Sequence, residues 1–173
     1  TLKCWGANNI GQAGMSTPNQ QLGERASDVG ANLPIVQLGT NRFATAIATG
    51  NAFACALLDN SAVKCWGANG NGQLGLGSTL PKGQFPGEMG DRLPVVSLPN
   101  GRSFVSITTS SDANHVCAIL DDASLSCWGA CSLGQCGLGV STDWGTAPVH
   151  MGNGLPTVNL GPSLTALQVG TGF

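Results

Sequence analysis

Short apolar runs, separated by glycine, asparagine, aspartate or serine, follow one another along the whole chain. Each run contains mainly small, β-branched or aromatic side chains. Runs of this length between turn residues are typical of β-strands. In the best-defined part of the chain they occupy residues 33–39, 43–49, 52–58 and 62–67. No segment longer than ten residues keeps a helical period, so the pattern predicts an all-β protein.

The same order of segments returns with a fixed period. The sequence Cys-Trp-Gly begins at Cys4, Cys65 and Cys127, at intervals of 61 and 62 residues. Such a period indicates a repeat architecture. The predicted units are 1–6 (the end of one), 33–67, 93–129 and 155–173 (incomplete). Because the chain opens and stops within a unit, we expect both ends to be edges within a longer array of repeats.

Four short antiparallel strands per repeat predict the blade of a β-propeller. The chain would then supply about two to three blades of a larger ring. A β-solenoid is the alternative, but its repeats are usually about 20–30 residues long, shorter than the period here. Insertions at one recurring position emerge on one face of a repeat scaffold. The variable loops that join the units are therefore the expected partner-contact face, and they span residues 7–32, 68–92 and 130–154.

A glycine-rich motif follows each Cys-Trp-Gly and is best preserved from Cys65 to Gly77. Its pattern, Trp-Gly-x-Asn-x-x-Gly-Gln-Leu-Gly-x-Gly, resembles the repeats of the regulator of chromosome condensation family. The resemblance covers nearly the whole chain and recurs in register. It implies a propeller that is usually seven-bladed. It also implies two activities found among similar proteins, nucleotide exchange on a small GTPase and inhibition of an enzyme by the propeller face.

The recurring residues of this motif have structural explanations. One tryptophan per repeat is the frequency that packing between blades requires, and each indole could bury about 150–250 Å². We expect Gly67 and Gly75 to hold backbone angles that a Cβ forbids, or to allow close backbone approach. Gln73 can pair with backbone groups that the loop leaves unsatisfied. The motif tryptophans are Trp5, Trp66 and Trp128.

Six of the seven cysteines are spaced as three disulfide pairs. Cys55 and Cys65 are ten residues apart around a predicted turn, as are Cys117 and Cys127. With a three-residue hairpin loop, the two members of each pair lie directly opposite each other on neighbouring strands. Ser61 and Ala123 would then stand where such turns prefer glycine.

The remaining cysteines divide into a pair and a single residue. Cys131 and Cys136 appear together in only one copy of the glycine-rich loop, which suggests that they bond to each other. Cys4 would have its partner about ten residues before Thr1. Free buried cysteines are the alternative for all seven. A zinc site is disfavoured because there is no Cys-x-x-Cys and neither His115 nor His150 recurs.

Composition narrows the classes of function. Charged residues make up 9% of the chain, there are 26 glycines, and the net charge is −2 without a run of either sign. A nucleic-acid-binding face needs clustered lysine and arginine, so we expect no nucleic-acid partner. No stretch approaches the roughly 20 apolar residues of a membrane span, and no signal peptide is visible. Paired cysteines favour an extracellular or cell-surface location over a nuclear or cytoplasmic one.

Chemistry-bearing motifs are weak. Residues 70–75 spell the dinucleotide-binding glycine pattern, but the other copies break it and no helix is predicted after it. Asp121 and Asp122 form a turn without the spacing of a calcium loop. His115 has no motif that supplies a catalytic partner. We therefore expect no catalytic residue, no cofactor and no metal.

The sequence thus favours a non-enzymatic scaffold. Its partners would be other proteins or neighbouring copies in an assembly, and its alternatives are a GTPase exchange factor or an enzyme-inhibiting propeller. Phe85 is the candidate contact residue of the second variable loop. Trp144 is the candidate of the third loop and is expected to belong to no repeat position.

Overall fold

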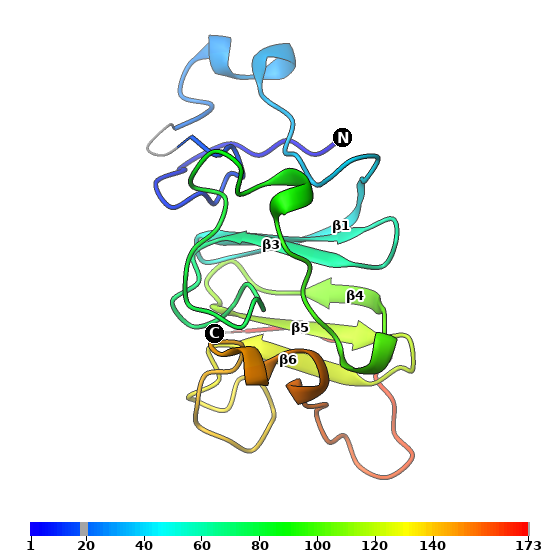
Figure 1. Ribbon diagram of the computed structural model, residues 1–173. Helices are drawn as coiled ribbons and strands as arrows, with labels where there is room; N and C mark the ends of the chain where they lie inside the picture. Colours follow the sequence, from blue (N-terminus) through cyan, green and yellow to red (C-terminus); the bar gives the residue numbers. More distant parts are fainter. Residues whose placement is uncertain (18–20, 173) are drawn as a thin grey trace.

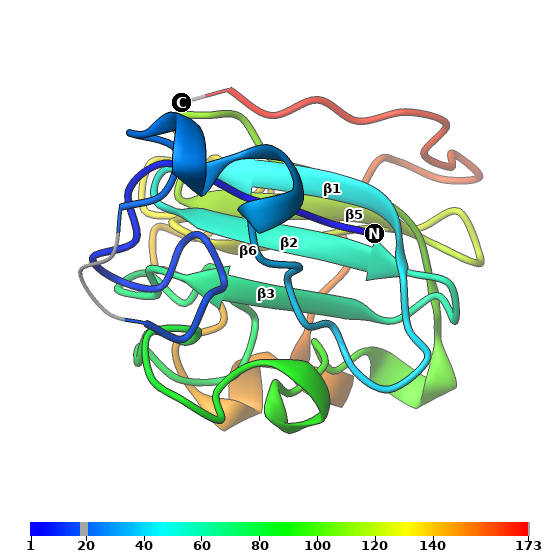
Figure 2. The same cartoon turned by 90° about the horizontal axis from the view of Figure 1, so that it is seen from above.

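Two antiparallel sheets account for the strands of the computed structural model, which describes residues 1–17 and 21–172. Figure 1 shows the sheets one above the other, and Figure 2 shows the strands of the first sheet from above. In each sheet the strand order follows the chain, β1-β2-β3 and β4-β5-β6. The all-β prediction is therefore confirmed. The strands are β1 (Ala44–Gly50), β2 (Phe53–Leu58), β3 (Val63–Gly67), β4 (Phe104–Thr108), β5 (His115–Leu120) and β6 (Leu125–Gly129).

Tight hairpins connect the second and third strands of each sheet. Ser61 and Ala123 both have φ of 61°, the left-handed region that usually selects glycine. Local hydrogen bonds stabilise both turns: the Asn60 carboxamide oxygen accepts from the Ala62 N–H, and the Asp122 carboxylate accepts from the Ser124 N–H. Both turns thus hold non-glycine residues in a conformation that costs free energy.

The first predicted segment of each unit is extended but forms no ladder. The Val96 N–H donates to the Val63 carbonyl oxygen at 2.8 Å, and the Val158 N–H donates to the Leu125 carbonyl oxygen at 2.7 Å. The proline two residues before each valine has no N–H, which removes a donor from the segment. The segment that contains Val96 therefore lies beside β3, and the segment that contains Val158 lies beside β6. In the sequence period each of these segments opens the next unit.

Helical structure in the described residues is limited to three-residue 3₁₀ turns. Three of them begin at the recurring glycine before Leu-Pro, where Gly30, Gly90 and Gly152 have positive φ. The turns are η1 (Ala26–Asp28), η2 (Gly30–Asn32), η3 (Gly90–Arg92), η4 (Pro99–Gly101), η5 (Pro148–His150) and η6 (Gly152–Gly154). The described part of the chain contains no helix long and apolar enough to cross a membrane.

The core lies between successive repeats. One cluster of buried residues joins Phe53 and Val63 of the first sheet to Val116 and Trp128 of the second. A second cluster packs Trp66 of the first sheet with the extended segment 33–38, which borders residues 1–6. Each sheet therefore buries its faces against its neighbours along the stack. This packing is that of consecutive propeller blades.

Candidate functional site

Two disulfides close the β2–β3 and β5–β6 hairpins. Cys55 pairs with Cys65 across the ladder with Cα atoms 4.0 Å apart, and Cys117 pairs with Cys127 at 4.2 Å. All four side chains are buried. The two predicted pairings are therefore present in the structure. They form because each three-residue turn places its two cysteines directly opposite each other on neighbouring strands.

The third disulfide closes a glycine-rich loop. Cys131 bonds to Cys136, as predicted. In the other two copies an asparagine side chain joins the same two positions: Asn8 accepts from the Ala13 N–H at 3.0 Å, and Asn69 accepts from the Leu74 N–H at 2.9 Å. Cys4 is free in the described residues and half-buried, and burial raises the pKa of its thiol.

The asparagine carboxamide also ties the glycine-rich loop to the start of the variable loop. Its amide group donates to the Thr17 carbonyl oxygen in the first copy, and to those of Ser78 and Leu80 in the second. Sequence reasoning assigned no role to these asparagines. The sequence did contain a signal for this role. Cys131 stands at the position of the asparagine, and Cys136 stands at the position of the residue whose N–H the asparagine binds in the other two copies.

Two of the three motif tryptophans form joints between repeats. Trp66 and Trp128 are fully buried. The Trp66 Nε1–H donates to the Gln12 carbonyl oxygen and the Trp128 Nε1–H to the Gln73 carbonyl oxygen, both at 3.1 Å. Trp5 differs, since it is 69% exposed. No described segment covers its outer face in the way that the preceding glycine-rich loop covers Trp66 and Trp128.

The other motif residues lie at close backbone contacts. A Cβ on Gly75 would lie 2.8 Å from Trp128 Nε1, and one on Gly67 would lie 2.5 Å from the Ala52 carbonyl oxygen. The Gln73 side-chain oxygen accepts from the Asn71 N–H at 2.9 Å. The loop that spells the dinucleotide-binding pattern is thus packed against its neighbour, with no helix of the described residues after it.

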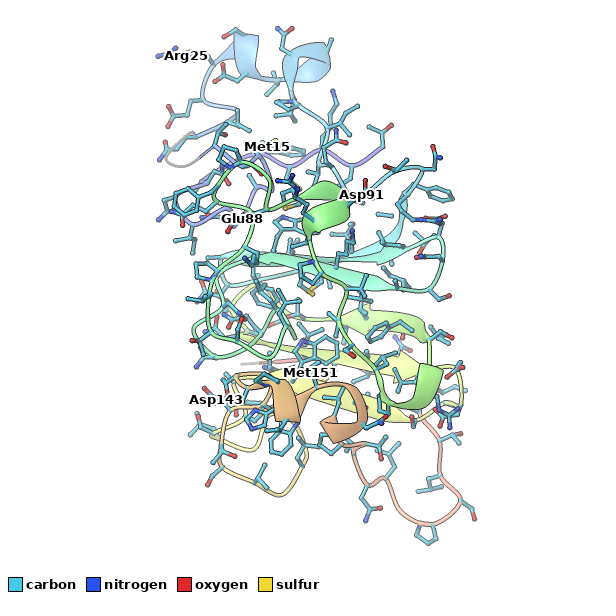
Figure 3. The ribbon with its side chains drawn as sticks, in the orientation of Figure 1. Met15, Arg25, Glu88, Asp91, Asp143 and Met151 are labelled. Atoms are coloured by element: carbon cyan, nitrogen blue, oxygen red, sulfur yellow. A yellow bond between two sulfur atoms is a disulfide. The ribbon has the colours of Figure 1, made fainter. Side chains whose placement is uncertain are left out.

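The second variable loop holds an aromatic side chain towards solvent. The Glu88 carboxylate accepts from the N–H groups of Gln84 and Phe85, both at 3.0 Å, and its other oxygen lies 3.5 Å from Lys82 Nζ. Phe85 itself remains 54% exposed. Figure 3 shows Glu88 in this loop, beside the first sheet. The loop is therefore ordered by its own side chain while the ring stays free.

Trp144 occupies a recurring position, contrary to the sequence prediction. Its backbone forms an isolated antiparallel β-bridge with Gly129. Lys82 forms the same bridge with Gly67, and Leu22 with Gly6. The Trp144 ring stacks on His150 with centroids 4.5 Å apart, while its buried Nε1–H has no hydrogen-bond partner among the described residues. Trp144 is thus packed into its own loop and is less available to a partner than Phe85.

Titratable groups in the sheets serve the scaffold. Lys64 is buried, and its Nζ donates to the carbonyl oxygens of Leu38 and Gly90 at 2.9 and 2.7 Å. Burial lowers the pKa of Lys64, and the nearby Asp91 carboxylate partly offsets this. The exposed Asp91 accepts from the hydroxyl and N–H of Thr40, and these hydrogen bonds lower the pKa of its carboxyl group.

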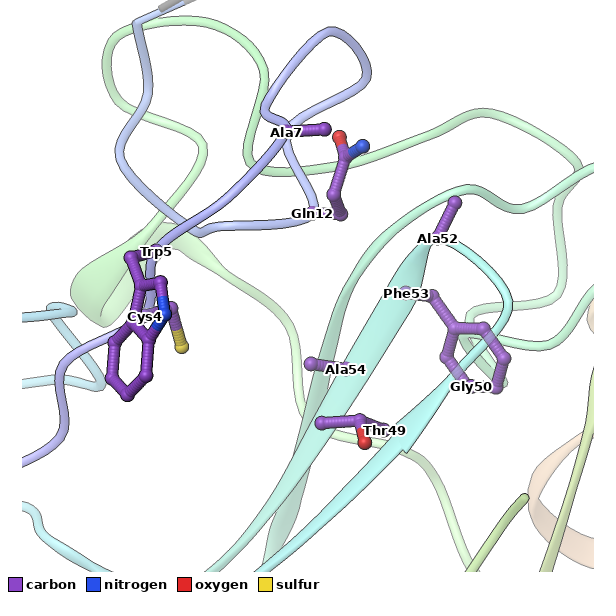
Figure 4. A pocket seen from close by; sticks show the side chains of 9 residues that line it. All are labelled: Cys4, Trp5, Ala7, Gln12, Thr49, Gly50, Ala52, Phe53 and Ala54. Atoms are coloured by element: carbon purple, nitrogen blue, oxygen red, sulfur yellow. The ribbon is translucent and has the colours of Figure 1, made fainter. Parts of the chain in front are cut away.

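His115 of β5 is buried. Burial lowers the pKa of His115, which favours the neutral ring. Among the described residues, no group of three or more His, Cys, Asp or Glu side chains could hold a metal ion. A hollow of about 390 Å³ lies between Trp5 and the β1–β2 hairpin, and Figure 4 shows the Cys4 thiol at its side. Its lining is mostly apolar, and its polar side-chain groups are those of Gln12 and Thr49, the Cys4 thiol and the Trp5 indole N–H.

Comparison with known proteins agrees with this geometry. Residues 44–73 match the regulator of chromosome condensation (RCC1) repeat. The ultraviolet-B receptor UVR8 of Arabidopsis thaliana is 31% identical over 142 residues, which are 80% of this chain and 27% of that protein. The chain therefore spans about a quarter of this curated relative.

Solved structures share the fold. Human WBSCR16 superposes with a TM-score of 0.65 at 17% identity, over 99% of this chain and 39% of that one. Prp20p of Saccharomyces cerevisiae gives 0.56 at 20% identity, over 89% of this chain and 33% of that one. The repeat match, the curated relative and the shared fold lead to one conclusion: the chain consists of RCC1-type repeats that form successive blades of part of a β-propeller.

Proposed function

We propose that the chain is a non-enzymatic repeat scaffold that presents its variable loops to a protein partner. The observation that carries this proposal is Phe85, whose backbone is fixed by Glu88 while its ring is 54% exposed. Exposed aromatic side chains on preordered loops are frequent anchors of protein–protein contacts. Leu80 of the same loop is 66% exposed and adds apolar area. RCC1-type repeats typically mediate protein interactions, which supports the same function.

An exposed phenylalanine at the other end of the sheet provides a matched control. Phe43 is 55% exposed and lies beside the β2–β3 turn, where its carbonyl oxygen accepts from the Asp59 N–H. The variable loop begins at the opposite end of β3. Partner capture by the wild type, Phe85→Ser and Phe43→Ser should be compared by crosslinking and mass spectrometry. We expect Phe85→Ser alone to lose the partner, and equal capture by all three would contradict the proposal.

We place this scaffold in an oxidising compartment, at the cell surface or outside the cell. The support is the set of three disulfides that involves six of the seven cysteines, since structural disulfides are rare in the cytosol and nucleus. Peptide mapping without reductant, on protein from its native source, tests this part. We expect linked peptides for each pair, and free thiols at Cys55 and Cys65 would rule out the extracellular location.

Nucleotide exchange is the second candidate, and the shared fold with Prp20p favours it. The solved Prp20p structure is described together with its binding to Gsp1p and histones. Release of labelled GDP from a small GTPase of that class, measured with and without the chain, separates the two candidates. Acceleration of release would favour exchange, whereas an unchanged rate together with Phe85-dependent capture would favour the scaffold.

A further inference from the structure

A lysine ties the end of the variable loop to the adjacent strand segment in two repeats. The Lys3 Nζ donates to the Gly30 carbonyl oxygen at 2.6 Å, and the Lys64 Nζ donates to the Gly90 carbonyl oxygen at 2.7 Å. Each lysine stands directly before a Cys-Trp-Gly motif, and each glycine begins the 3₁₀ turn before Leu-Pro. The same side-chain position therefore reaches the same backbone acceptor in successive repeats.

The third repeat keeps the acceptor but not the lysine. Gly152 begins η6 as Gly90 begins η3, and its carbonyl oxygen accepts from the Leu155 N–H at 3.1 Å. Because a carbonyl oxygen has two lone pairs, it can accept a second hydrogen bond. The residue before the third Cys-Trp-Gly is Ser126, at the position of Lys64. Its side chain ends well short of the place that a lysine ammonium reaches.

Ser126 is a buried polar residue whose hydroxyl group is unpaired. It lies in β6 on the same face as Trp128, which packs between the two sheets. The side chain is fully buried, and its Oγ has no hydrogen-bond partner among the described residues. An unpaired hydroxyl in such a place is destabilising, and native proteins usually satisfy it with protein groups or with ordered water. Ser126 therefore points to a small polar ligand at the joint between the sheets.

The residue next to the glycine acceptor has changed together with the lysine. Asp91 follows Gly90, and its carboxylate acts on the Lys64 ammonium through its charge. Asn153 follows Gly152 and is neutral. The ammonium and the nearby carboxylate are thus both replaced by neutral side chains. A neutral ligand fits this environment, whereas a buried cation would lack the compensating negative charge.

We propose that one water molecule takes, in the third repeat, the place that the lysine ammonium takes in the second. The water donates to the Gly152 carbonyl oxygen and accepts from the Ser126 hydroxyl group. Buried waters make about three hydrogen bonds. The Leu98 carbonyl oxygen is the other acceptor, as the counterpart of the Leu38 oxygen that Lys64 binds at 2.9 Å. The third variable loop is then tied to its sheet through water, and the second loop directly through lysine.

Removal of the Ser126 hydroxyl group tests the proposal through the sign of its effect on stability. In Ser126→Ala the water loses one partner, so we expect the midpoint of urea unfolding to fall. Without a water, the same change would remove an unpaired buried hydroxyl, and the midpoint would stay constant or rise. Ser106→Ala, at a half-buried serine of β4, is the control for alanine in a strand and should change the midpoint less. A Ser126→Ala variant at least as stable as the wild type would overturn the proposal.

A crystal structure that resolves ordered waters locates the molecule directly. We expect one density peak within hydrogen-bonding distance of both the Ser126 Oγ and the Gly152 carbonyl oxygen. The second repeat is the internal control, because the Lys64 Nζ should fill the same place beside Gly90. Crystals grown with rubidium ions separate a water from a monovalent cation, since only the cation gives an anomalous signal. The absence of a peak, or an anomalous peak at this place, would overturn the proposal.

Discussion

Cys131 and Cys136 form a covalent bond between the two loop positions that a hydrogen bond joins in the other repeats. In the second copy these positions are Asn69 and Leu74, and the Asn69 oxygen accepts from the Leu74 N–H at 2.9 Å. The asparagine leaves its amide group free to bind the variable loop, which the disulfide cannot do. The third loop is therefore closed by a covalent bond, and its tie to the following segment is a different one, from the Cys131 N–H to the Asp143 carboxylate at 3.1 Å.

Exchanging one closure for the other tests their equivalence. The double variant Cys131→Asn with Cys136→Leu should fold with its loop closed, because the new carboxamide can accept from the N–H of residue 136. It should be more stable than Cys131→Ala with Cys136→Leu by about 1 kcal/mol, the usual contribution of one such hydrogen bond. Urea unfolding gives the difference, and amide exchange at residue 136 locates it. Equal stability and equal exchange in the two variants would contradict this interpretation.

Two glycines with similar backbone angles allow the joint between repeats to be measured. Gly72 and Gly134 have φ of 78° and 86°, so alanine at either position is strained by about 1 kcal/mol. Only Gly72 faces a neighbour, because a Cβ added there would lie 2.6 Å from the backbone of Gly145.

We expect Gly72→Ala to lose at least about 1–3 kcal/mol more than Gly134→Ala, the usual cost of overpacking a close contact. Chemical denaturation of both variants under the same conditions gives the comparison. Similar losses would mean that the backbone angle, and not the contact with the next repeat, accounts for the glycine.

The local parts of this structure could be predicted from the sequence. The ten-residue spacing of Cys55 and Cys65 around a short turn determines the hairpin register, because two cysteines that lie directly opposite each other require a turn centred on Asn60. The same register predicts the strained turn position at Ser61. Both features depend on neighbours within one hairpin.

The parts that depend on contacts between repeats could not be predicted in the same way. The pattern shows that residues 93–98 are extended, but it does not show that Val96 bonds to the preceding sheet through Val63. Trp5 and Trp66 have the same local sequence, and only the presence of a covering loop makes one buried and the other exposed. Trp144 was missed as a recurring position because the side chain there changes from leucine to lysine to tryptophan, although it follows the motif glycine by 16 residues in the first copy and by 15 in the other two.

The cross-strand disulfides should contribute strongly to stability. In the chain-entropy model a bond that closes a loop of this length contributes about 3 kcal/mol. Cys55→Ala with Cys65→Ala should therefore lower the free energy of unfolding by about that amount, with a further loss from the small cavity. Cys4→Ser, which breaks no bond in the described chain, is the control and should cost much less. Urea denaturation without reductant measures both, and equal losses would contradict the prediction.

His115 should make the stability of the fold depend on pH on the acid side of neutrality. Its side chain is only 3% exposed, and burial lowers its pKa from the ordinary 6.5. The unfolded chain therefore binds a proton at a higher pH than the folded chain does. Stability is fully present above the unfolded pKa, and it decreases as the pH falls from about 6.5 towards the lower folded pKa.

Replacing this side chain with one that does not titrate isolates its contribution. His115→Gln should be less stable than the wild type at pH 7.5, because glutamine fits the site less well. The gap between the two proteins should narrow as the pH falls below 6.5, since only the wild type then loses stability through this group. Urea unfolding of both proteins at a series of pH values gives the gap directly. A gap that stays constant or widens towards acid pH would mean that the His115 ring takes up its proton as easily in the folded chain as in the unfolded one.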